Sequence, residues 1–157
     1  MLIGGAPGVG KSTIANIIYK KIHNSVWLDG DDLWRMNPFN VNDKTKDMVI
    51  TNIQFVLNSF LSGSYSTVIF TWVLHLDSIV ELIRSAIRYD HNFFHFTLVC
   101  DEKILQERIN SDNERTTDIC LALDRLQKSR LVNSEIIDTS KYSPFSIANF
   151  LKTKIIS

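Results

Sequence analysis

Short apolar runs alternate with longer amphipathic stretches from one end of the chain to the other. Five of these runs are bounded by glycine or polar residues and have the length and composition of buried strands. They occupy residues 1–4, 26–29, 67–71, 94–99 and 135–138. Because the runs are almost continuously apolar, we expect a parallel sheet that is covered on both faces.

Between the runs, apolar residues recur every three or four positions, which is the spacing of a buried helix face. These faces comprise Ile14, Ile17, Ile18 and Ile22; Val49, Ile53, Val56, Leu57 and Phe60; Ile79, Ile83, Ala86 and Ile87; Leu105 and Ile109; Leu123 and Leu126; and Ile147, Leu151 and Ile155. We expect Gly63 to end the second helix, Asp77 to be the N-cap of the third, and Pro144 to begin the last. The alternation predicts an α/β fold in a single domain over residues 1–157.

Composition and charge bear on the possible partners. The chain is 45% hydrophobic and 22% charged, as in ordinary globular domains. Seventeen basic residues balance seventeen acidic ones, so the net charge favours neither nucleic acid nor an anionic membrane as a partner. Cys100 and Cys120 lack the spacing of metal ligands or of a disulfide framework. No run is long enough for a transmembrane helix, and the glycine loop begins too close to Met1 for a signal peptide. We therefore expect a cytoplasmic monomer or homodimer.

Residues 5–12, GAPGVGKS, match the complete G-x-x-x-x-G-K-[ST] pattern of a P-loop between a predicted strand and a predicted helix. The glycines let successive backbone N–H groups turn toward an anion, and the helix N-terminus adds its dipole. In such a loop Lys11 reaches the β- and γ-phosphates and the Ser12 hydroxyl can ligate Mg²⁺. We therefore predict ATP and Mg²⁺ as cofactors. The predicted nucleotide-binding residues are Gly5, Ala6, Pro7, Gly8, Val9, Gly10, Lys11, Ser12 and Thr13.

Three aspartates, Asp29, Asp31 and Asp32, fall within four positions where the second predicted strand ends. Ligands of open parallel sheets bind outside the carboxyl ends of the strands. Crowded carboxylates repel one another, and a nearby metal ion and lysine offset that repulsion. If this strand ends at the same edge as the P-loop strand, one carboxylate can support Mg²⁺ and another can orient or deprotonate an acceptor hydroxyl. Asp32 is expected to be the N-cap of a following helix.

Large aromatic side chains follow the aspartates. Trp34 and Phe39 come directly after them, and Trp72 ends the third predicted strand. These rings either stack on a flat, partly apolar acceptor, such as a nucleoside or an antibiotic, or close the hydrophobic end of the sheet; the sequence leaves both readings open. Arg35 is a candidate for binding an anionic substituent of the acceptor.

The P-loop and the strand end Leu28-Asp29-Gly30-Asp31 resemble the small P-loop kinases, namely shikimate, gluconate and adenylylsulfate kinases and chloramphenicol phosphotransferase. The resemblance implies the three-layer P-loop nucleoside triphosphate hydrolase fold with a five-stranded parallel sheet and a short lid. It also implies transfer of the ATP γ-phosphoryl group to a hydroxyl or phosphate of a small molecule. By the same resemblance Asp29 is associated with the metal and Asp31 with the acceptor hydroxyl.

The resemblance extends, with less specificity, to the second half of the chain. Arg108 and Arg115 stand seven positions apart. They resemble the lid arginines of shikimate-type kinases, of which the earlier stacks on adenine and the later contacts phosphates. Residues 136–140 and the following Pro144 resemble the adenine loop. Arg125 lies in the helix from which this group often contacts substrate, although a solvated helix arginine is an equally simple interpretation.

The chain also departs from these kinases. The glycine-rich triplet that ends the third strand of shikimate kinase is replaced by residues 70–75, FTWVLH, and no aspartate ends that strand. Asp29, or water, is then left to support the metal. The resulting hypothesis makes Lys11, Asp31 and Arg115 catalytic in a small-molecule kinase. The alternative is an ATP-binding regulatory protein with weak ATPase activity, which would have no use for a second carboxylate beside the P-loop.

Overall fold

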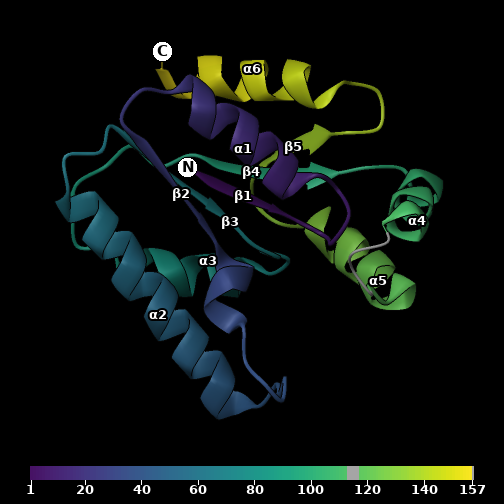
Figure 1. Ribbon diagram of the computed structural model, residues 1–157, viewed down its shortest axis with the longest axis horizontal. Helices are drawn as coiled ribbons and strands as arrows, with labels where there is room; N and C mark the ends of the chain where they lie inside the picture. Colours follow the sequence, from purple (N-terminus) through teal and green to yellow (C-terminus); the bar gives the residue numbers. More distant parts are fainter. Residues whose placement is uncertain (113–116, 157) are drawn as a thin grey trace.

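The structure is a computed structural model that describes residues 1–112 and 117–156 (Figure 1). Its strands are β1 (Leu2–Gly5), β2 (Ser25–Asp29), β3 (Thr67–Thr71), β4 (His95–Val99) and β5 (Glu135–Asp138). Its helices are α1 (Lys11–Lys21), the 3₁₀ helix η1 (Gly30–Trp34), α2 (Asp43–Ser62), α3 (Asp77–Arg84), α4 (Glu102–Ser111), α5 (Ile119–Ser129) and α6 (Pro144–Ile156). The five strands expected from the apolar pattern are confirmed, with ends displaced by at most one residue.

The sheet is parallel throughout, and its strands lie in the order β2-β3-β1-β4-β5. Leu2 of the central strand β1 pairs with Phe70 of β3 on one side and with His95 of β4 on the other. The chain runs from β1 to the edge strand β2, returns through β3, and continues beyond β1 with β4 and β5. Because the order reverses at β1, the carboxyl end of β1 is the switch point where such sheets bind ligands. β2 ends at this same edge, with β3 between it and β1.

Helices cover both faces of the sheet, as the apolar strands predict (Figure 1). α1 and α6 pack together on one face, where Ile14 and Leu151 are buried in one hydrophobic cluster. α2 and α3 lie on the other face, and Ile53 belongs to a second cluster there. Successive residues of β1 alternate between the two, Ile3 joining the first cluster and Leu2 the second. Within the two described ranges, no helix combines the length and apolar character needed to cross a membrane.

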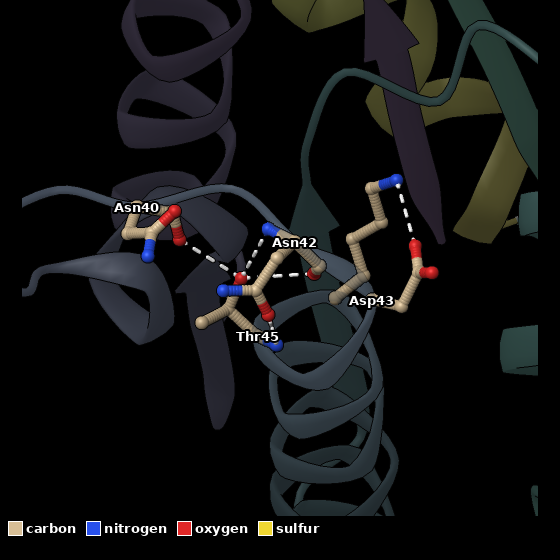
Figure 2. A network of polar contacts seen from close by, with 5 residues as sticks. Asn40, Asn42, Asp43 and Thr45 are labelled. Atoms are coloured by element: carbon tan, nitrogen blue, oxygen red, sulfur yellow. Dashed lines mark hydrogen bonds and ion pairs between the residues drawn. The ribbon is translucent and has the colours of Figure 1, made fainter.

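Side chains fix both ends of the segment between β2 and α2. At its start, the Asp29 carboxylate accepts the backbone N–H of Asp31 (3.2 Å), which turns the chain into η1. At its end, the Asn42 side chain accepts the N–H of Thr45 (3.1 Å), and the Thr45 hydroxyl accepts the N–H of Asn42 (2.9 Å). This reciprocal capping box, shown in Figure 2, sets the first residue of α2 and so limits the reach of the connecting segment.

The expected N-cap of α3 is wrong. Leu76 occupies the N-cap position of α3, and Asp77 is the first residue of the helix. The Asp77 carboxylate instead accepts the backbone N–H of Asn133 (2.9 Å), a tertiary contact that local sequence does not indicate. α3 also ends at Arg84, so residues 86–87 lie beyond it.

Candidate active site

The P-loop connects β1 to α1 at the switch point of the sheet. Gly5, Gly8 and Gly10 have φ values of +138°, +84° and +100°, which side chains rarely allow. A Cβ on Gly5 would also lie 2.5 Å from the carbonyl oxygen of Leu98, so this position needs glycine for space as well as for conformation. The loop therefore depends on its glycines to reach the α1 N-terminus.

Lys11, the first residue of α1, folds back over the loop. Its Nζ donates to the carbonyl oxygens of Gly5 and Ala6, each at 2.9 Å. Both of these loop residues are buried. The ammonium group is thereby held above the same loop whose N–H groups and helix dipole favour an anion.

Ser12 and Asp29 meet across the site, although they come from α1 and from the end of β2. The Ser12 hydroxyl donates to Oδ2 of Asp29 at 2.9 Å. Within residues 1–112 and 117–156, no group of three or more His, Cys, Asp or Glu side chains could bind a metal by itself. One hydroxyl and one carboxylate fit Mg²⁺, which keeps several waters and is often bound together with substrate phosphates.

A cleft of about 480 Å³ opens beside the P-loop. Residues 7–14 line it, and so does Asp31 of η1. Arg108, Thr139 and Tyr142 also line it. The structure thus brings the P-loop, one of the three aspartates and the first candidate lid arginine around one cavity. Thr139 and Tyr142 were not assigned individually from the sequence, but they lie in or next to the segment that resembles an adenine loop.

Arg108 connects α4 to the loop after β5. Its guanidinium donates to the carbonyl oxygen of Thr139 (2.8 Å) and to the Thr139 hydroxyl (3.0 Å). That hydroxyl donates in turn to the carbonyl oxygen of Val9 in the P-loop (3.2 Å). Because guanidinium offers several N–H donors in one plane, it can hold this loop and still present a face to the cleft.

We expect Arg108→Ala to weaken ATP binding about tenfold, since it removes charge-assisted hydrogen bonds that shape the cleft. Calorimetric titration with ATP measures the change. Lys103→Ala, on the exposed surface of the same helix, is the matched control. Equal ATP affinity of the two folded variants would contradict a role for Arg108 in the nucleotide site.

The three aspartates have different surroundings. Asp29 contacts Ser12, and Asp31 lines the cleft. Asp32 is not a helix N-cap, because Asp29 occupies that position of η1. Instead, Oδ1 of Asp32 accepts from Nε (3.0 Å) and Nη2 (2.6 Å) of Arg35. This hydrogen bonding raises the pKa of Arg35 further above its usual range, and Arg35 points into solvent with its partner.

Trp72 lies beneath the turn that carries the aspartates. It is only 9% exposed, and a Cβ added to Gly30 would lie 2.6 Å from its ring. The centroids of the Trp72 and Trp34 rings lie 5.9 Å apart. Trp72 therefore supports the turn between Asp29 and Asp31 and offers little surface for an acceptor. Its contact with a substrate stays a prediction.

We expect Gly30→Ala to lower the free energy of unfolding by about 1–3 kcal/mol, because the new methyl group overpacks against the Trp72 indole. Urea denaturation measures the loss. In a Trp72→Leu background the same change should cost less, since the two positions are in contact. Identical costs in both backgrounds would show that the indole is not what restricts position 30.

The remaining candidates lie further from the cleft or cannot be placed. Arg125 is on α5, with Nη1 3.7 Å from Oδ2 of Asp124, and it is not among the described residues that line the cleft. Arg115, the second candidate lid arginine, lies in residues 113–116, outside the described residues. The catalytic role of Arg115 therefore stays a prediction.

The chain and its structure are similar to known proteins. The AAA domain family matches residues 1–138. The structure is similar to the tunicamycin resistance protein of Deinococcus radiodurans, with a TM-score of 0.73 and 19% identity over 99% of this chain and 94% of that chain. The structure is also similar to a gluconokinase from Sinorhizobium meliloti 1021, with a TM-score of 0.74 and 15% identity over 99% of this chain and 90% of that chain.

A shikimate kinase from Acinetobacter baumannii, in complex with shikimate, is similar with a TM-score of 0.65 and 18% identity over 99% of this chain and 90% of that chain. No curated protein sequence matches this chain. The suspected resemblance to small P-loop kinases is thus confirmed for the fold, which the described elements share with these structures. With most of its length matched, the chain belongs to the AAA domain family.

Proposed function

We propose that this chain is an ATP-dependent phosphotransferase that moves the γ-phosphoryl group to a hydroxyl or phosphate of a small molecule. One observation carries the proposal: the Asp31 carboxylate lines the same cleft as the P-loop residues. A protein that only binds ATP needs the loop, whereas a carboxylate at the phosphate end of the cleft is what an acceptor hydroxyl requires.

The P-loop binds and orients the phosphates in this proposal. Its inward N–H groups and the α1 N-terminus attract the phosphate oxygens, and Lys11 neutralises part of their charge. The Lys11 ammonium now donates to the carbonyl oxygens of Gly5 and Ala6. Phosphate oxygens carry more negative charge than carbonyl oxygens, so they would compete well for this donor.

Ser12 and Asp29 are the residues that would hold Mg²⁺, Asp29 either directly or through water. When bound, Mg²⁺ neutralises charge on the β- and γ-phosphates. The hydrogen bond from the Ser12 hydroxyl to Oδ2 of Asp29 (2.9 Å) supports this pairing, since it brings both oxygens close enough to contact one ion. Asp29 also accepts the Asp31 N–H, and this second bond fixes its orientation.

Asp31 orients the acceptor hydroxyl and accepts its proton as the oxygen bonds to the γ-phosphorus and ADP leaves. In a loose phosphoryl-transfer transition state, orientation contributes more than proton removal. Arg115 would contact the phosphates from the lid, as the resemblance to shikimate-type kinases implies. We propose that these groups act in one cytoplasmic domain, as a monomer or homodimer that binds neither nucleic acid nor membranes.

The test is a screen of ADP release with Mg-ATP and candidate acceptors. Gluconate, shikimate and tunicamycin represent the molecules named for similar structures, and nucleosides and chloramphenicol extend the range. A kinase should release ADP faster with one acceptor, and Asp31→Asn should remove that increase. ATP binding with feeble turnover, whichever acceptor is added, would favour the regulatory alternative.

A further inference from the structure

The 3₁₀ helix η1 places an aromatic ring beside the proposed acceptor carboxylate. In such a helix, side chains three residues apart lie on the same face, one turn or roughly 6 Å from each other. Asp31 and Trp34 are three residues apart within η1. Asp31 lines the P-loop cleft and Trp34 does not, so a molecule whose hydroxyl reaches Asp31 meets the Trp34 indole only where it extends beyond that cleft.

The Trp34 ring is partly exposed, packs against the second hydrophobic cluster and has an aromatic neighbour. It is half-buried against Trp72, and Phe39 lies 6.1 Å away, with 67% of its surface exposed. The buried Nε1 of Trp34 has no hydrogen-bond partner among the described residues. Packing alone therefore holds the indole, and the Trp34–Phe39 pair presents an apolar surface suited to stacking on a planar ring.

The charges around this surface do not favour an anion. Asp29, Asp31 and Asp32 lie within four positions, and Arg35 is held by Asp32 at 2.6 Å. At the start of α2, Nζ of Lys46 lies 3.4 Å from Oδ1 of Asp43. An acidic acceptor would approach several carboxylates, and Asp32 and Asp43 already neutralise part of the charge of Arg35 and Lys46.

We infer that the acceptor is an uncharged alcohol that carries a planar unsaturated ring, and that Trp34 selects it by stacking. This inference rests on the proposed function and narrows its substrate class. A sugar acid would find neither a free cation at Arg35 nor polar groups on the Trp34–Phe39 surface. A nucleoside or a phenylpropanoid alcohol has both the ring and the neutral hydroxyl.

Kinetics of the full chain with Mg-ATP test the inference. The neutral probes are adenosine, thymidine and chloramphenicol, and the anionic probes are gluconate, shikimate and AMP. We expect a neutral probe to accelerate ADP release, and Trp34→Ala to raise the KM for that probe about tenfold while kcat changes little. Trp34→Phe keeps a ring and should restore most of the affinity. Phe55→Ala, at a 74% exposed position of α2, should leave the KM unchanged.

Tryptophan fluorescence separates binding from turnover. With a non-hydrolysable ATP analogue bound, a neutral probe should quench the tryptophan fluorescence of the wild type and of Trp27→Phe. It should not quench that of Trp34→Phe. Trp27 is the matched control, since its Nε1 is bonded to Thr71 (3.0 Å) and its ring lies 6.5 Å from that of Tyr19.

The possible outcomes each decide a point. An anionic probe as the preferred acceptor, or an unchanged KM in Trp34→Ala, would overturn the inference and leave the kinase proposal standing. Quenching at Trp34 without faster ADP release would support the ring selectivity and contradict the kinase proposal. If no neutral probe quenched the fluorescence and none accelerated ADP release, the inference would be overturned.

Discussion

Replacing Lys11 with alanine is expected to weaken ATP binding by roughly 10²-fold while the fold is retained. Lys11 supplies the positive charge above the P-loop and is the residue we expect to contact the β- and γ-phosphates. Its Nζ donates to the carbonyl oxygens of Gly5 and Ala6, and Lys11 is not part of the hydrophobic clusters, so its loss should leave them intact.

Calorimetric titration of the folded variant with Mg-ATP measures this loss. Lys20→Ala is the matched control, because Lys20 is an exposed lysine on the same helix and does not line the cleft. The control should bind ATP as the wild type does. Wild-type affinity in a folded Lys11→Ala protein would remove the nucleotide-binding interpretation of the P-loop.

Asp31→Asn is expected to leave Mg-ATP binding close to wild type and to slow phosphoryl transfer by roughly 10²- to 10⁴-fold, as is typical when a general base is lost. Asparagine is nearly isosteric with aspartate, so packing is preserved while the proton acceptor is removed. A loose transition state would place the loss at the lower end of this range, because orientation by the amide oxygen would then suffice.

Two neighbouring aspartates provide the comparison. Asp29→Asn should raise the Mg²⁺ concentration needed for activity, since a weakened metal site can be refilled by mass action. Its amide can still accept the N–H of Asp31, and the Ser12 hydroxyl can turn to accept from the new NH₂ group. Asp32→Asn should be close to wild type, because its oxygen can still accept from Arg35.

A Mg²⁺ titration of ADP release distinguishes these variants. It uses the acceptor found in the screen, or basal ATP hydrolysis before one is known. Wild-type behaviour of all three variants would mean that the aspartates form a solvated turn outside the active site. If Asp29→Asn and Asp31→Asn both raised the Mg²⁺ concentration needed for activity, both carboxylates would instead contact the metal.

The features that the sequence determined are those governed by residues close together in the chain. The P-loop was recognisable because its glycines, Lys11 and Ser12 must stand in one order to close an anion nest at a helix end. The strands were recognisable because a sheet covered on both faces leaves continuous apolar runs. Even the aspartate-rich turn was evident, since its carboxylates had no structural explanation.

Local reasoning was wrong where a tertiary contact offered a better partner. Asp77 had the sequence context of an N-cap, but its carboxylate bonds the backbone of Asn133, 56 positions away. Asp32 could not be the cap of η1 because Asp29, one turn earlier, already accepts the N–H of Asp31. For Trp72 the sequence left open a substrate contact or a hydrophobic wall; the structure packs its ring under the turn at Gly30, and a contact with the acceptor stays a prediction.

Only the tertiary structure decided which of the candidates share a site. Ser12 and Asp29 are 17 positions apart, and Arg108 and Thr139 are 31 apart. Each pair meets because the parallel strands β1, β2, β4 and β5 end at the same edge of the sheet. Side-chain types and local spacing do not encode strand order, since it is set by how the helices bury both faces of the sheet at once.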